Sequence, residues 1–187
     1  MLKTLLVYTH LIAACLAIGV ILLQDIALAK WRGRPMDADS IANLQRNTHL
    51  ATLALVILWA SGLAIVAIGY IDVPGYLMNQ KLWAKFAVVS ILTLNGLFLH
   101  YYSFPVLASP KGFVGASGKG QLLVVITAVV SLVSWLYACY LGIARPWNNT
   151  VPFAYVMLVY SLVLTVALVV ALELWRELRN EYRSLAQ

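Results

Sequence analysis

The chain has 187 residues, of which 63% are hydrophobic and 11% are charged, and its mean hydropathy is +0.87. Because a soluble domain carries about 25% charged residues, this composition excludes an ordinary soluble protein and indicates an integral membrane protein. The formal net charge of +6 comes mostly from basic residues in loops and tails, where membrane topology explains them, so we expect no nucleic-acid partner.

Five apolar stretches are long enough to cross a lipid bilayer, which takes about 20 residues. They are residues 4–29, 48–71, 81–107, 121–143 and 152–175, and a charged helical tail follows at 176–187. The predicted fold class is therefore all-α integral membrane, a single transmembrane domain (1–187) in which five helices form a bundle.

The connections carry helix-capping and turn signals. Asp39 and Ser40 are candidate N-caps for a second helix that starts before the membrane. The segment Asp72-Val73-Pro74-Gly75 predicts a turn, and Pro152 suits the first turn of the fifth helix.

The distribution of Lys and Arg predicts the orientation in the membrane. Five spans put nine basic residues on the side of the C-terminus and four on the side of the N-terminus. The nine are Lys30, Arg32, Arg34, Arg46, Lys111, Lys119, Arg176, Arg179 and Arg183, and the four are Lys3, Lys81, Lys85 and Arg145. Because cytoplasmic loops carry an excess of Lys and Arg, we expect the N-terminus outside and the C-terminus in the cytoplasm, in a bacterial-type inner (plasma) membrane.

Ionisable residues inside the predicted spans fall into two layers. His10 and Lys85 lie near the outer ends of the first and third helices. Asp25 and His100 each follow 15 positions later, roughly 22 Å deeper at about 1.5 Å per residue, and His49 lies near the inner start of the second helix. Such residues are costly in hydrocarbon and commonly mark a functional site.

Imidazoles at matched depth on different helices are typical of b-type haem sites in helical bundles. His49 and His100 predict bis-His ligation in the inner layer, where Asp25 can orient a ligand imidazole. In the outer layer His10 is the imidazole, and Lys85 can ligate the iron or pair with a haem propionate. The pattern allows one haem or two.

Each of these residues also has a structural interpretation. His10 can be a packed, hydrogen-bonded histidine, and Lys85 can extend toward the outer interface. His49, His100 and Asp25 can be solvated near the inner interface. Arg145 belongs to an interfacial segment and can pack there or contact a propionate or a quinone.

The segment Tyr8-Thr9-His10-Leu11-Ile12-Ala13-Ala14 with Gly19, and Leu82-Trp83-Ala84-Lys85-Phe86 in the third helix, resemble the HemJ-type protoporphyrinogen oxidases. That family is related to CopD-like copper-resistance proteins, and the resemblance covers about the first three helices. It implies haem b ligation by His10 and Lys85. The chain departs from the family pattern at Ala17-Ile18-Gly19 and Gln24-Asp25.

Three functions remain open at this point. The first is a membrane-embedded haem b protein, a possible oxidoreductase that transfers electrons with a quinone or a porphyrin as partner. The second is a CopD-type protein that handles copper or another metal ion. The four methionines and two cysteines lack ligand spacing, which weakens copper(I) but leaves a histidine-lined Zn or Cu(II) path. The third is a non-catalytic membrane subunit, in a homo-oligomer or a larger complex.

Overall fold

The structure is a computed structural model that describes residues 1–31 and 35–185, with side chains as far as residue 180. Its elements are α1 (Leu2–Lys30), α2 (Ala38–Asp72), α3 (Gln80–Phe98), α4 (Phe104–Leu107), α5 (Gly118–Ile143) and α6 (Phe153–Leu185), with a π-helix at Leu99–Ser103 and 3-10 turns at Tyr76–Met78 and Arg145–Trp147. The described residues contain no strand, and five helices are long and apolar enough to span a membrane, with α3, the π-helix and α4 forming one span. The prediction of an all-helical protein with five helices long and apolar enough to span a membrane is confirmed.

The helix boundaries follow from local capping. α2 begins at Ala38, about ten residues before the apolar stretch, as the capping signal indicated. Its N-cap is Asp37, whose carboxylate accepts a hydrogen bond from the Ser40 amide at 2.8 Å. The predicted N-caps Asp39 and Ser40 were therefore wrong by two and three residues. The predicted turn before α3 contains Gly75 at φ +74°, a left-handed conformation that glycine adopts without strain.

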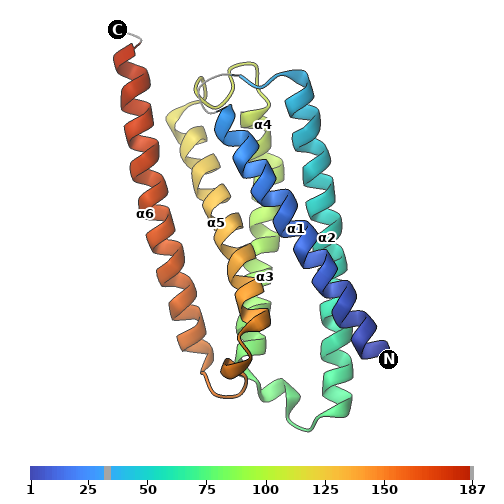
Figure 1. Cartoon of the computed structure of the whole chain (residues 1–187). Helices are drawn as coiled ribbons and strands as arrows, with labels where there is room; N and C mark the ends of the chain where they lie inside the picture. The colour runs from blue at the N-terminus through green and yellow to red at the C-terminus, as the bar shows by residue number, and fades with distance from the viewer. Residues whose placement is uncertain (32–34, 186–187) are drawn as a thin grey trace.

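The five spans form one bundle with the two termini at opposite ends (Figure 1). α1 lies across α2, and α5 lies between α3 and α6. α2 and α3 are bridged by large side chains, because the Trp59 indole donates to Thr93 Oγ1 at 3.0 Å and lies 5.9 Å from the Phe86 ring. The chain therefore consists of an α1–α2 hairpin set against the α3–α5–α6 group.

Small residues let these two groups meet. Ala17 of α1 and Ala54 of α2 pack with Leu92 of α3 and Trp135 of α5, and the Ala17 side chain is fully buried. Small side chains at helix crossings allow backbones to approach closely, which is the main source of packing energy between membrane helices.

Hydrogen bonds fix α6 to α5 near both of its ends. Tyr160 and Ser134 share a hydrogen bond of 2.8 Å, and Tyr137 donates to the Val156 carbonyl at 2.7 Å. Toward the C-terminus the Trp175 indole donates to Gln121 Oε1 at 3.2 Å. The opposite face of α6 exposes aliphatic side chains that suit contact with lipid: Leu158, Leu162, Val163, Val166, Val169 and Val170.

The π-helix follows from Pro105. Proline lacks a backbone N–H and its ring collides with the carbonyl four residues earlier, so a regular helical turn is disfavoured here. The turn widens, and the Phe104 amide donates to the Leu99 carbonyl, five residues back. Ser103, fully buried, bonds Thr127 Oγ1 at 2.8 Å, which ties the widened turn to α5.

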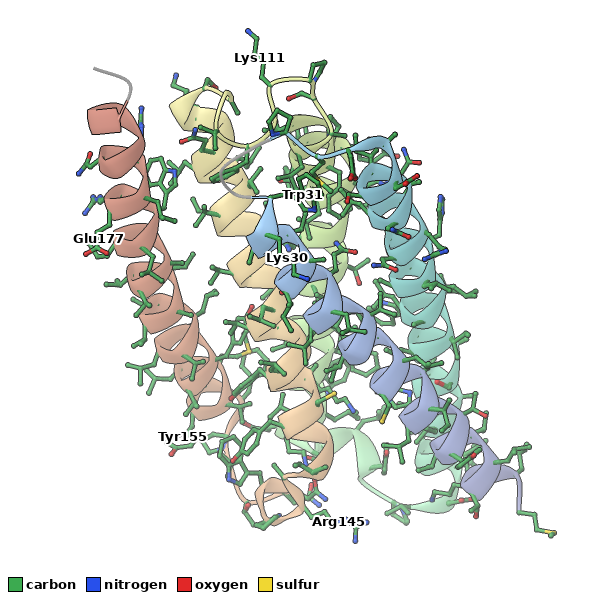
Figure 2. The ribbon with its side chains drawn as sticks, turned by 45° about the horizontal axis from the view of Figure 1, so that its top comes forward. Lys30, Trp31, Lys111, Arg145, Tyr155 and Glu177 are labelled. Atoms are coloured by element: carbon green, nitrogen blue, oxygen red, sulfur yellow. The ribbon has the colours of Figure 1, made fainter. Side chains whose placement is uncertain are left out.

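The two ends of the bundle carry different sets of charges. Arg145 lies at the N-terminal end, whereas Lys111 and Glu177 lie at the opposite end (Figure 2). Arg32 and Arg34, which belong to the basic set predicted for the C-terminal side, lie outside the described residues, as does the side chain of Arg183.

We expect Ala17→Leu to destabilise the bundle by about 1–3 kcal/mol, because the added side chain overfills a fully buried helix crossing. Ala27→Leu is the matched control, since Ala27 is exposed on the same helix. Thermal unfolding of both variants in detergent measures the difference. Equal stability of the two variants would contradict the packing described for Ala17.

Candidate functional site

His10 of α1 is held by a hydrogen bond to Ser61 of α2. Its Nδ1 lies 2.8 Å from Ser61 Oγ, and Ser61 Oγ lies 2.6 Å from the Ile57 carbonyl oxygen. A hydroxyl has one proton, so when Ser61 donates it to Ile57, the Ser61 oxygen accepts from Nδ1–H. A neutral His10 oriented in this way carries its lone pair on Nε2.

Gly62 provides the space for this ring. A Cβ added at Gly62 would lie 3.3 Å from His10 Cε1, which is tighter than ordinary van der Waals contact. The imidazole therefore packs closely against α2 at Gly62. Glycine at this position allows α1 and α2 to approach closely enough for the hydrogen bond to Ser61.

Lys85 lies at the same end of the bundle, on α3. Its Nζ is 3.8 Å from the position that a Cβ of Gly142 would occupy, near the C-terminal end of α5. It lies within electrostatic range of His10 and of the Cys139 thiol. Lys85 is half-buried, and among the described residues it has no hydrogen bond or ion pair.

Lys81, one turn before Lys85, has a structural role. It is 7% exposed, and its ammonium donates to the Ala144 carbonyl at 2.8 Å. Ala144 caps the C-terminal end of α5, where the helix dipole favours a positive charge. Two lysines at i and i+4 therefore share one helix face, but only Lys81 is satisfied by the backbone.

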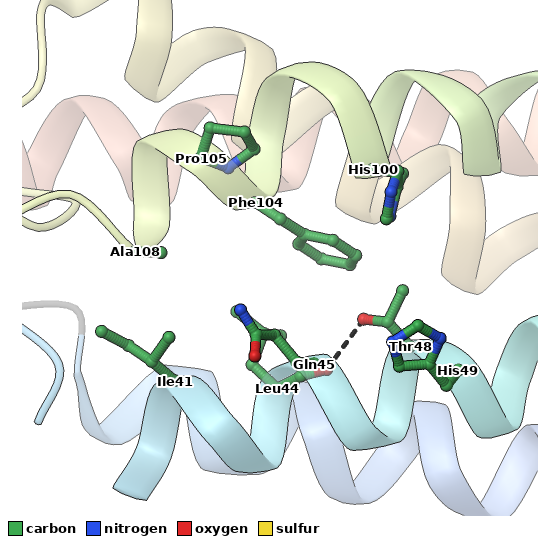
Figure 3. A pocket seen from close by; sticks show the side chains of 9 residues that line it. All are labelled: Ile41, Leu44, Gln45, Thr48, His49, His100, Phe104, Pro105 and Ala108. Atoms are coloured by element: carbon green, nitrogen blue, oxygen red, sulfur yellow. Dashed lines mark hydrogen bonds between the residues drawn. The ribbon is translucent and has the colours of Figure 1, made fainter. Parts of the chain in front are cut away.

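A second candidate site is a groove at the opposite end, between α2 and the π-helix with α4 (Figure 3). The groove has a volume of about 200 Å³. His49 and His100 extend into it from opposite walls, and both side chains are exposed. The remaining lining is mostly apolar and consists of Ile41, Leu44, Gln45, Thr48, Phe104, Pro105 and Ala108.

The other two predicted site residues stand apart from these sites. Asp25 is half-buried on α1, does not line the groove, and has no hydrogen bond or ion pair among the described residues. Arg145 is exposed at the N-terminal end, and its neighbour Trp147 packs edge-on against Tyr140 and Tyr155. An orienting role for Asp25 and a ligand contact for Arg145 stay predictions.

The structure thus brings His10 near Lys85, and places His49 and His100 on one groove. Sequence reasoning missed the roles of Ser61 and Lys81. Ser61 is 51 positions from His10 and gives no local signal, whereas the i, i+4 spacing of Lys81 and Lys85 was visible. Within residues 1–31 and 35–185, no group of three or more His, Cys, Asp or Glu side chains forms a metal-binding cluster.

Comparison with protein-family models, curated proteins and solved structures found no match to this chain. The resemblance of its first three helices to HemJ-type and CopD-like proteins therefore stays a prediction.

We expect ¹⁵N-histidine spectra of the unliganded protein to show His10 protonated at Nδ1 and bare at Nε2. Ser61→Ala removes the hydroxyl that accepts from Nδ1–H, a hydrogen bond of about 1 kcal/mol, and should raise the share of the Nε2–H tautomer. Solid-state NMR of the labelled protein in lipid measures both nitrogens. Ser134→Ala is the control, since that hydroxyl bonds Tyr160, and a shift of equal size in both variants would contradict the assignment.

Proposed function

We propose that this chain is a membrane-embedded haem b protein that carries out electron transfer, with His10 as an iron ligand. The observation that supports this most is the position of His10, whose Nδ1 lies 2.8 Å from Ser61 Oγ, so that an Nδ1–H donated there leaves the Nε2 lone pair available. Histidines that bind metals commonly donate their other ring nitrogen in this way. Lys85 is either the second nitrogen ligand or the partner of a haem propionate, and its ammonium has no competing counterion among the residues that the structure describes.

The donor set fits the group in chemical type, because imidazole nitrogen is a common ligand of haem iron. A bound haem supplies one-electron chemistry. The chain supplies a fixed imidazole position through Ser61 and Gly62 and a positive charge at Lys85. A quinone or a porphyrin is the proposed redox partner.

The groove of the inner histidines is small for a macrocycle. The groove between His49 and His100 has a volume of about 200 Å³, below the roughly 300–1,000 Å³ of typical ligand pockets. We therefore propose one haem, at His10 and Lys85, and assign His49, His100 and Asp25 no iron.

The optical spectrum of the purified protein separates this function from its alternatives. A Soret band supports the haem protein. Copper or another metal without porphyrin would favour a CopD-type metal-handling function. A colourless, metal-free protein would favour a non-catalytic membrane subunit.

We expect His10→Ala to lower the haem content. Loss of a partner that orients a metal-bound histidine lowers affinity about 10–100-fold, and loss of the ligand itself should lower it by at least as much. The pyridine-haemochrome yield per mole of folded protein measures this. The double variant His49→Ala/His100→Ala is the matched control and should keep its haem. Unchanged yield in His10→Ala would remove His10 as a ligand, and loss of haem in the control would move the site to the groove.

We also propose that the N-terminus lies outside the cell and the C-terminus in the cytoplasm of a bacterial-type inner membrane. The basic residues described at the C-terminal end support this: Lys30, Arg46, Lys111, Lys119, Arg176 and Arg179.

We expect an epitope tag at the N-terminus to bind antibody on intact spheroplasts, because the outer end of α1 carries few basic residues. The same tag at the C-terminus should bind only after permeabilisation. The opposite pattern of labelling would reverse the orientation and place His10 and Lys85 toward the cytoplasm.

A further inference from the structure

The groove at the inner end is built by one face of α2 and by the widened turn opposite it. Ile41, Gln45, Thr48 and His49 recur at helical spacing, so they share one face of α2 over roughly 12 Å. Thr48 Oγ1 already donates to the Leu44 carbonyl at 2.8 Å, as Figure 3 shows. The groups left to contact a ligand from α2 are therefore the His49 imidazole and the Gln45 amide.

The opposite wall is held in place by α5. Asn95 Nδ2 donates to the Thr127 carbonyl at 2.9 Å, and Ser103 bonds the Thr127 hydroxyl at 2.8 Å. These bonds bracket His100, which lies in the π-helix and faces the groove while Ser103 is buried toward α5. Widened helical turns of this kind are frequent at functional sites. The wall that carries His100 is thus fixed by polar contacts on its far side.

The lining indicates the chemistry of the ligand. Apart from the two imidazoles, Gln45 and Thr48, the walls are apolar, and Phe104 and Pro105 give flat surfaces for a ring. Among the described residues the groove is lined by no Lys, Arg, Asp or Glu, so this lining offers no charge to recognise a phosphate or a carboxylate. It suits an uncharged ring whose acceptor groups bond imidazoles.

The level of the groove indicates where the rest of such a ligand lies. The segment 38–47 of α2 is polar, and the apolar stretch begins at 48, so His49 marks the boundary between interface and hydrocarbon. A ligand with its head at this level and an apolar tail would keep that tail in the bilayer. The volume of about 200 Å³ suits one ring better than a macrocycle.

We propose that this groove binds the head group of a lipid-soluble quinone, with His49 and His100 as hydrogen-bond donors to its carbonyl oxygens and Phe104 against its ring. The role of the quinone as a redox partner rests on the proposed haem-linked electron transfer. Its binding site rests on the groove alone. His10 and Lys85 take no part in it, so the two sites are separable by mutation.

Titration of decylubiquinone into the full-length chain in quinone-free phosphatidylcholine nanodiscs, followed by calorimetry against empty nanodiscs, tests the proposal. We expect His49→Leu and His100→Leu each to weaken binding about tenfold, the effect of one lost hydrogen bond to a fixed partner. Ile41→Trp should fill the groove and abolish binding. Leu53→Trp is its control, because Leu53 is exposed on α2 and does not line the groove. Decylbenzene, which has a ring and tail but no carbonyls, should bind at least tenfold more weakly.

Several outcomes would overturn the proposal. They are no binding of decylubiquinone to the wild-type chain, equal binding by Ile41→Trp and Leu53→Trp, and equal binding of decylbenzene. A phospholipid or a haem retained at His49 and His100 would also overturn it. His10→Ala separates the two proposals, since it should remove haem and leave decylubiquinone binding unchanged. A protein that holds haem but does not bind quinone would contradict this inference alone. A protein that binds quinone but holds no haem would contradict the proposed function alone.

Discussion

Hydrocarbon supplies no hydrogen bonds, so every polar group within the spans of this chain needs a partner inside the protein. Among the described residues no fully buried side-chain nitrogen or oxygen lacks one. The partners commonly lie on another helix: Ser61 for His10, Ala144 for Lys81 and Thr127 for Asn95. These contacts set the depth and rotation of the helices, since an apolar face alone would let them slide.

The residues that do not follow this pattern mark the candidate sites. Lys85 has no counterion or hydrogen bond among the residues that the structure describes, and it lies near an imidazole. His49 and His100 are exposed on the walls of a largely apolar groove. Polar and charged side chains of this kind are unfavourable in hydrocarbon unless a ligand or water supplies a hydrogen-bond or ionic partner. The proposed haem and quinone would each complete one of the two sets.

The five spans could be predicted from hydropathy and length, because a bilayer requires both. The levels of the polar residues also followed from the rise per residue, and His49 and His100 do lie on one groove. Contacts between helices could not be predicted. The pairing of His10 with Ser61 depends on how α1 crosses α2, which Ala17 and Gly62 decide through packing. The widened turn at His100 follows from Pro105, but its tie to Thr127 depends on α5.

The division of the bundle into an α1–α2 hairpin and an α3–α5–α6 group has a mechanical consequence. Both sites lie on the seam between these groups: His10 of α1 and Lys85 of α3 lie within electrostatic range at one end, and His49 and His100 line one groove at the other. Trp59 of α2 donates to Thr93 of α3 and so links the two groups across the seam. A ligand bound at either end would contact both groups and so hold them together there.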